Sequence, residues 1–309
     1  MNPETLTLTD GGIETALTDR LGQELPEFAA FVLLETPGGR EALRAYYRPF
    51  VALAADTGRS LVLDTPTWRA NPDWGRLLGY TANDLDRLNA AAVALTREVA
   101  TGAEKASVTV TVAGCVGPRF DDWVTDERMS ADEAATYHGA QVRALVAAGV
   151  DRVTAVTMLD AAEATGVVRA AQTAGAPVVV SFTVGADGRL ADGSTLRDAI
   201  RNLDLATDGY ADGVFVNCAH PSEAGLALAE ARRQSATDDW VDRLSGFRLN
   251  AARHDDSGPG DDPVTFARGV AALRLLAPAA RTLGGCCGTD VPHIAALAAE
   301  LTALEWGED

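Results

Sequence analysis

The stretch TLGGCCGTD, residues 282–290, is the part of the chain from which we work out its fold. Two adjacent thiols, Cys286 and Cys287, follow a short apolar run and lie between glycines. The next residues, Asp290-Val291-Pro292, have the pattern of a capped helix start. Glycines allow backbone or a ligand to approach closely. The stretch therefore predicts a strand that ends in a turn presenting two thiols.

A third thiol, Cys218, ends another apolar run that begins at Phe215. Three thiolates without a fourth ligand nearby are the pattern of a catalytic zinc site with one open position. The wide spacing does not fit a local zinc finger, so the three can meet only through the tertiary fold. Two other interpretations remain open from the residues alone. The cysteines can be small buried residues of a core, or Cys286 and Cys287 can form a strained disulfide.

Short β-branched runs alternate with longer alanine-rich segments of helical period along the whole chain. We expect eight strands, at Leu6–Thr9, Ser60–Asp64, Val108–Ala113, Arg152–Thr157, Val178–Phe182, Gly213–Val216, Gly246–Asn250 and Thr282–Gly285. The expected helical segments between them include Arg40–Ala55, Ala82–Ala100, Ala131–Ala148, Ala161–Ala174, Ser222–Arg232 and Pro263–Leu276.

Eight such strand–helix units predict a single (β/α)8 barrel domain over residues 1–309, with function gathered at the carboxyl ends of the strands. No low-complexity linker divides the chain. The turn-rich, acidic stretch Arg248–Asp262 is expected to be a loop within this domain.

Composition restricts the partners. The net charge is −18, from 44 acidic and 26 basic residues, and such a field repels nucleic acid and anionic membranes. No apolar run reaches the ~18 residues that a transmembrane helix needs, and the N-terminus lacks a signal-peptide pattern. We therefore expect a cytoplasmic protein without membrane or nucleic-acid partners. Four cysteines in 309 residues make no disulfide framework, and a reducing compartment keeps them as thiols.

The predicted strands are followed by a distinctive set of residues. Asp10-Gly11-Gly12 follows the first strand, Asn217-Cys218 ends the sixth, and Gly284-Gly285-Cys286-Cys287-Gly288 ends the eighth. In these motifs the chain resembles the zinc-dependent homocysteine S-methyltransferases, the barrel group that includes the betaine- and S-methylmethionine-dependent enzymes. The resemblance runs from Asp10 to Ile294, essentially the whole chain.

The resemblance implies a Zn²⁺ ion held by Cys218, Cys286 and Cys287, with the acceptor thiol in its open position. Coordination would keep that thiol deprotonated and therefore nucleophilic at neutral pH. The implied partners are a small-molecule thiol acceptor, homocysteine or a related thiol, and a small onium methyl donor. The implied product is methionine or another thioether.

The donor's positive charge favours aromatic neighbours through cation–π contact. Trp68 and Phe28 stand where the family has a tyrosine and a tryptophan, so both are predicted to line the donor site, with packing of a lid as the alternative. Asp10 matches a family aspartate, and we predict a catalytic and substrate-binding carboxylate there. The alternative for Asp10 is a turn-forming residue before two glycines.

Several other residues at strand ends and on helices are weaker candidates. Thr157, Asn217 and Asn250 end their strands and are predicted to bind substrate, although the two amides can instead close turns. His138 lies in a helical segment and is expected to be structural, and Cys115 to be a packing residue. For His220 and His293, which follow the metal cysteines, a supporting role behind the ligands remains open.

One position departs from the family pattern. Where the family has Phe-Glu-Thr after the fourth strand, this chain has Ala155-Val156-Thr157. Val156 cannot hold the ammonium of homocysteine, so the chemistry is better supported than the acceptor, which can be a thiol that is not an amino acid.

Other classes of protein remain open from the sequence. One is a non-catalytic barrel that binds zinc or thiols, and another is a redox protein with a Cys286–Cys287 disulfide. The donor and the oligomeric state are not determined by the sequence.

Overall fold

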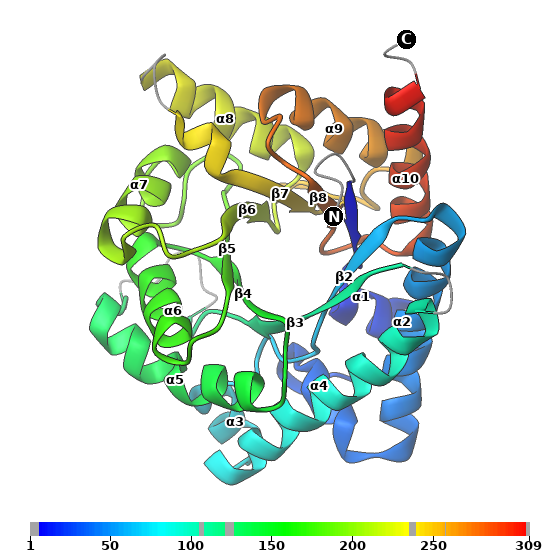
Figure 1. Ribbon diagram of the computed structural model, residues 1–309, viewed down its shortest axis with the longest axis vertical. Helices are drawn as coiled ribbons and strands as arrows, with labels where there is room; N and C mark the ends of the chain where they lie inside the picture. Colours follow the sequence, from blue (N-terminus) through cyan, green and yellow to red (C-terminus); the bar gives the residue numbers. More distant parts are fainter. Residues whose placement is uncertain (1–5, 105–107, 121–126, 235–238, 257, 307–309) are drawn as a thin grey trace.

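The computed structural model describes residues 6–104, 108–120, 127–234, 239–256 and 258–306. Eight parallel strands close into a barrel in sequence order, with β1 pairing β8, and helices surround it (Figure 1). This confirms the predicted (β/α)8 fold class. The strands are β1 (Thr7–Thr9), β2 (Ser60–Asp64), β3 (Val110–Val116), β4 (Arg152–Met158), β5 (Val178–Phe182), β6 (Gly213–Asn217), β7 (Leu244–Leu249) and β8 (Thr282–Gly285).

The helices follow the strands and cover the outside of the barrel (Figure 1). None within the described residues combines the length and the apolar character that crossing a membrane requires. The α-helices are α1 (Ile13–Asp19), α2 (Pro37–Thr57), α3 (Pro72–Leu77), α4 (Ala82–Glu104), α5 (Ala131–Ala147), α6 (Ala161–Thr173), α7 (Leu196–Thr207), α8 (Pro221–Gln234), α9 (Pro263–Leu276) and α10 (Val291–Trp306), and the 3₁₀ segments are η1 (Pro26–Phe28), η2 (Ala30–Glu35) and η3 (Asp239–Arg243).

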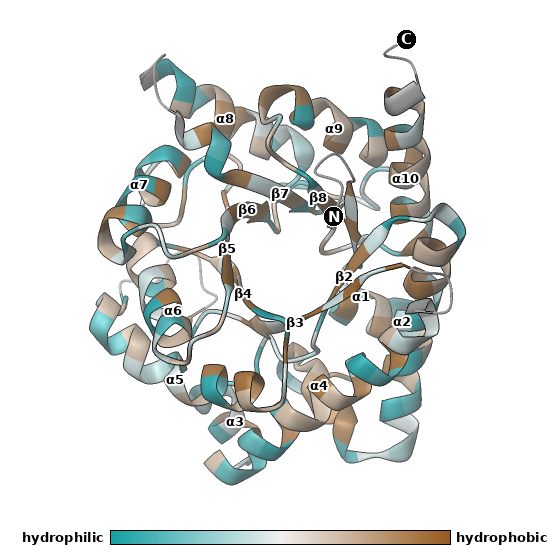
Figure 2. Ribbon diagram, viewed as in Figure 1, coloured by the Kyte–Doolittle hydropathy of each residue, from teal (hydrophilic) through white to brown (hydrophobic). Residues whose placement is uncertain are grey.

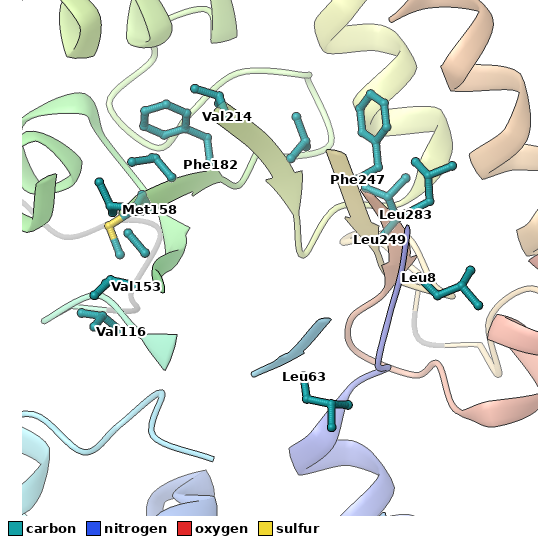
Figure 3. Close-up of a cluster of buried hydrophobic side chains, with 14 of the residues drawn as sticks. Leu8, Leu63, Val116, Val153, Met158, Phe182, Val214, Phe247, Leu249 and Leu283 are labelled. Atoms are coloured by element: carbon teal, nitrogen blue, oxygen red, sulfur yellow. The ribbon is translucent and has the colours of Figure 1, made fainter. Parts of the chain in front are cut away.

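Alternation along the strands separates the hydrophobic core from the functional interior. Successive strand side chains point to opposite faces, and Leu63 and Phe247 point outward toward the helices (Figure 3). Their neighbours Asp64 and Arg248 therefore face the barrel interior. Figure 2 shows the complementary pattern, with hydrophobic residues on the strands and hydrophilic residues on the outer faces of helices such as α3. The apolar contacts that stabilise the fold lie between the sheet and the helices. The interior of the barrel is therefore available for polar groups.

Helix α5 shows how local sequence fixes the surrounding layer. Ser130 caps its start and forms a reciprocal capping box with Glu133, which satisfies backbone N–H groups that have no partner inside the helix. The helix buries Val142 and Leu145. At the contact with α6, a Cβ on Gly166 would lie 2.3 Å from the Cβ of Ala134. Small residues therefore let α5 and α6 pack closely.

Several of the predicted strand boundaries are wrong by one to three residues, including the seventh strand, expected at 246–250 and found at Leu244–Leu249. The third strand was expected at 108–113, but β3 begins at Val110 and continues to Val116, because its register with β2 starts at Leu61 paired with Val110. Cys115 therefore lies inside a strand. The loop expected at 248–262 starts too early, since Arg248 and Leu249 belong to β7 and pair with β8.

Candidate metal centre and substrate cavities

Three thiols from two distant parts of the sequence meet at the carboxyl ends of β6 and β8. The sulfur atoms of Cys218, Cys286 and Cys287 all lie within 4.8 Å of one another, and those of Cys218 and Cys287 are 3.7 Å apart. Tetrahedral zinc with Zn–S bonds of about 2.3 Å places its sulfur ligands about 3.8 Å apart. All three cysteines are free thiols. The spacing and the chemistry of this thiol cluster therefore fit a metal ion with one open position.

Strand β7 lies between the two cysteine-bearing strands and holds both by backbone hydrogen bonds. The Cys218 amide donates to the Arg248 carbonyl at 3.1 Å, and the Cys286 amide donates to the Leu249 carbonyl at 2.8 Å. Cys218 has a φ of 53°, in the left-handed region that non-glycine residues rarely adopt. Such conformations persist where the surrounding contacts enforce them, often at functional sites. The backbone thus directs Cys218 toward the other two thiols.

Gly12 allows the first strand to approach the thiol cluster. A Cβ at this position would lie 2.5 Å from the carbonyl oxygen of Cys286. The Gly12 amide also donates to the Thr289 carbonyl at 3.1 Å. Any larger side chain must therefore displace the backbone that carries a metal-ligand candidate.

Replacing Gly12 by alanine is expected to weaken metal binding by roughly 10-fold or more, the range seen when groups that support metal ligands are disturbed. Gly38→Ala is a matched control, because a Cβ there meets nothing within 4 Å. Metal affinity is measured by competition with a chelator. Equal affinities of the two variants would contradict this account of Gly12.

The three thiols share their protons unequally. Hydrogen bonds from Cys218 and Cys287 lower the pKa of Cys286 well below its usual range, and Arg248 lowers it further. The hydrogen bond with Cys286 raises the pKa of Cys218. The hydrogen bonds that Cys287 makes with Cys218 and Cys286 raise the pKa of Cys287. A metal ion binds thiolates and displaces protons. The cluster therefore already favours one thiolate and would release protons on binding metal.

Two amides lie against the thiols. The Asn217 side chain donates to the Cys286 sulfur at 3.9 Å and to the Thr157 hydroxyl at 3.0 Å, while its oxygen accepts from the Thr157 amide at 2.9 Å. A hydrogen bond from Asn250 lowers the pKa of Cys218. Both amides are buried. The structure places them where they orient the sulfur atoms, and neither lines the cavity described next.

One cavity, here named the acidic cavity, joins most of the predicted site residues. Its wall contains three carboxyl groups, from Asp10, Glu14 and Asp64. The predicted site residues that line it are Asp10, Phe28, Trp68, Thr157, Cys218, Cys286 and Cys287, and Val156 lines it as well. The barrel thus brings the thiols, the aromatic rings and the strand-end carboxylate to one place.

A second cavity adjoins the first and is lined by one thiol of the cluster, Cys218. It shares Trp68, Thr157 and Cys218 with the acidic cavity and adds residues from other strand ends, including Thr183 and His254. Two neighbouring cavities therefore meet at Cys218, with Trp68 in the wall of both.

The Trp68 ring is fixed by its neighbours. A Cβ on Gly117 would lie 2.4 Å from the ring and from the Trp68 carbonyl oxygen. The indole nitrogen is buried and has no hydrogen-bond partner among the described residues. Since a buried N–H donor without a partner is costly, this atom is available to a bound ligand.

A buried ion network occupies the deep wall of the acidic cavity. Arg248 donates from Nη2 to Asp10 Oδ1 at 2.7 Å and from Nη1 to Asp64 Oδ2. Burial raises the pKa of Asp10 to about 8, while Arg248 acts to lower it. Tyr46 and Tyr47 support the same strand ends by donating to the carbonyls of Gly11 and Asp64. The predicted carboxylate at Asp10 is therefore present but already paired.

Arg248 and Glu14 were not among the predicted site residues. Arg248 lies between Phe247 and Leu249 in an apolar strand, and a charged residue with two apolar neighbours in a strand is a signal of an inward-facing polar group. It went unused, although Arg248 belonged both to the strand expected at 246–250 and to the loop expected at 248–262. Glu14 gives no such signal, since an acidic residue in the first turn of a helix is ordinary.

His138, His220 and His293 contact acidic residues, whereas His254 lines the second cavity together with Cys218. His138 is fully buried in α5 and its Nε2 lies 2.8 Å from Glu163 Oε1. His220 and His293 both contact Asp261, through its carboxylate at 2.9 Å and its carbonyl at 3.3 Å. These contacts join helices and loops, in agreement with the structural role expected for His138.

Comparison with known proteins agrees with this site. The family model for homocysteine S-methyltransferase matches residues 7–301. A homocysteine S-methyltransferase of Escherichia coli is 27% identical, over 97% of this chain and 96% of its own length. The homocysteine methyltransferase MmuM of Escherichia coli in its metallated form has a TM-score of 0.74 at 25% identity, with 96% of both chains covered. Its apo form, at 23% identity and a TM-score of 0.68, shares the fold. The chain belongs to the homocysteine S-methyltransferase family and is a thiol methyltransferase.

Proposed function

We propose that the protein is a zinc-dependent enzyme that moves a methyl group from a small onium donor to homocysteine or a related thiol. The observation that carries this proposal is the thiol cluster, whose three sulfur atoms lie within 4.8 Å at the meeting point of two cavities. The proposal includes a single domain and a cytoplasmic location. The product is a thioether, which is methionine when homocysteine is the acceptor.

Zinc is the metal that best fits this donor set. Soft thiolate ligands favour zinc over magnesium or calcium, and three protein ligands leave a position for substrate. When bound, the metal would lower the pKa of an acceptor thiol and so supply a nucleophile at neutral pH. Cys218, Cys286 and Cys287 would hold it, with the amides of Asn217 and Asn250 orienting the sulfur atoms.

Methyl transfer is a displacement at carbon. The acceptor sulfur uses a lone pair to form a bond to the methyl carbon, and the bond from that carbon to the onium atom breaks with its electron pair remaining on the donor. The acceptor's proton leaves to solvent, and the donor loses one positive charge. Such a step requires acceptor and donor on opposite sides of the methyl group, and we assign them to the two cavities, whose walls share Cys218 and Trp68.

The acidic cavity offers attraction for the onium charge. Phe28 and Trp68 contribute aromatic faces, and Glu14 contributes a carboxyl group on which Arg69 and Arg248 act electrostatically. Burial raises the pKa of Glu14 to about 7, so a cation beside it would favour the charged form. We assign the donor's positive charge to this part of the wall.

Replacing Trp68 by leucine is expected to raise the donor KM about 2- to 30-fold, because a cation–π contact contributes about 0.5–2 kcal/mol. Zinc content and the acceptor KM should stay near their wild-type values. Trp74→Leu is the control, since Trp74 stacks on Arg69 at 3.8 Å and does not line either cavity. An unchanged donor KM in Trp68→Leu would assign this ring to packing.

The function as a whole is tested by incubating zinc-loaded and metal-stripped protein with a panel of onium donors and thiols. Mass spectrometry of the thiols detects the added methyl group. We expect methylation only with the metal-loaded protein. Stable zinc binding without methyl transfer to any thiol would instead support a non-catalytic metal-binding barrel.

A further inference from the structure

Arg248 introduces a positive charge into the wall of the substrate cavity. Its side chain belongs to β7, is 6% exposed and lines the acidic cavity. Burial alone would lower its pKa, but Asp64 and Asp10 outweigh this effect and raise it, so the guanidinium is charged. It bridges Asp10 and Asp64 with one nitrogen each. The cavity thus contains its own cation.

This network uses the carboxylates that a substrate ammonium would need. An ammonium group that leaves water requires a carboxylate partner nearby. Asp10 and Asp64 are each bound to Arg248 through one oxygen, while Asp64 Oδ1 is buried without a partner among the described residues. From β4 the cavity receives the apolar Val156 and the neutral Thr157. Glu14 remains, on α1, in the part of the wall assigned to the donor. A second cation beside Arg248 would also be repelled by the guanidinium.

The same wall offers hydrogen-bond donors instead. The Arg248 Nε and Trp68 Nε1 atoms are both buried and without a partner among the described residues. Both side chains line the acidic cavity. Buried donors of this kind are expected to bind an acceptor atom of a ligand, and a hydroxyl, carbonyl or carboxylate oxygen provides one. These two donors call for an oxygen on the acceptor, and a hydroxyl or protonated carboxyl group there can also donate to the unpaired Asp64 Oδ1.

We propose that Arg248 is a specificity-determining residue that occupies the place of a substrate ammonium, so that the preferred acceptor is a thiol with an oxygen function and without an amino group. The inference rests on the proposed methyl transfer to a thiol and specifies its acceptor. Arg248 acts by taking up the charge of Asp10 and by presenting its free N–H group to the ligand.

The test compares homocysteine with 4-mercaptobutanoate, which has the same carbon chain and carboxylate but lacks the amino group. Binding of each thiol to zinc-loaded protein is measured by isothermal titration calorimetry, and kcat/KM for each by the methylation assay. We expect wild type to prefer 4-mercaptobutanoate at least tenfold by both measures. Equal or tighter binding of homocysteine would overturn the inference.

A pair of variants assigns the preference to Arg248. Arg248→Met combined with Asp64→Asn removes one positive and one negative charge, so the net charge of the wall is kept while Asp10 becomes free. This double variant should shift the binding ratio toward homocysteine at least tenfold. Asp64→Asn alone keeps the Asp10–Arg248 pair and should retain the wild-type preference. An unchanged ratio in a folded double variant would show that Arg248 does not determine the acceptor.

The inference and the proposed function fail in different ways. If homocysteine is methylated and preferred, the acceptor inference is wrong while methyl transfer stands. If the calorimeter shows binding but neither thiol, nor any other thiol of the panel, is methylated, the proposed function is wrong. The wild-type and Asp64→Asn comparisons decide the inference even if the double variant does not fold.

Discussion

Replacing any one of Cys218, Cys286 and Cys287 by serine is expected to remove bound zinc and to reduce methyl transfer by more than about 100-fold. A serine hydroxyl is a poorer ligand than thiolate and stays protonated at neutral pH. Disturbing groups that merely support a metal ligand already costs roughly 10- to 100-fold, so losing a ligand should cost more. Elemental analysis gives the zinc content and the methylation assay gives the activity.

Cys115→Ser is the matched control for metal content. Cys115 is buried in β3 and lines the acidic cavity, but it is not part of the thiol cluster. Circular dichroism should show that all four variants fold, because the main apolar core lies between the strands and the helices. A Cys218→Ala protein with full zinc content and full activity would refute the metal assignment.

The fold could be predicted from the sequence because strand and helix signals alternate without interruption. The strands Ser60–Asp64, Val178–Phe182 and Thr282–Gly285 have the predicted bounds. Strand β3 does not, because Val108 and Thr109 are as β-branched as the residues that pair, and only the register with β2 decides between them. Local patterns therefore identify a strand better than they locate its ends.

The thiol cluster follows from the barrel itself. Once parallel strands share one barrel, their carboxyl ends meet at one face, and thiols that end two of the strands must lie on that face. This argument allowed Cys218 and Cys286 to meet across 68 positions, and the family resemblance added that they hold a metal together. The structure brings the sulfur atoms together.

The ion network could not be found in the same way. Arg248 is separated from Asp10 by 238 positions and from Asp64 by 184. A local pattern does not specify which inward-facing side chains of β7, β1 and β2 reach the same height, since this depends on the stagger of the strands around the barrel. The sequence showed that Val156 stands where the family has a glutamate, but it did not show that the Arg248 guanidinium pairs with Asp10.

Replacing Arg248 alone by methionine is expected to lower the free energy of unfolding by about 3–5 kcal/mol, the usual effect of removing one partner of a buried ion pair. Asp10 and Asp64 would then be buried without their cation. Loss of Arg248 would also raise the pKa of Asp10 further above its value of about 8. A carboxyl with a raised pKa in the folded state loses stability as the pH rises toward that pKa. Wild type stops losing stability near its Asp10 pKa of about 8, whereas the variant continues to lose it, so the deficit should grow above about pH 8.

Urea unfolding at pH 6 and pH 9 measures both effects. The double variant Arg248→Met with Asp64→Asn is the control, because it removes the cation together with one of the carboxylates. It should recover a large part of the lost stability, since replacing both members of a buried pair costs far less than removing one. If the single variant is as stable as wild type at pH 9, the guanidinium is not needed to hold the two carboxylates, and the charge balance assigned to this cavity is wrong.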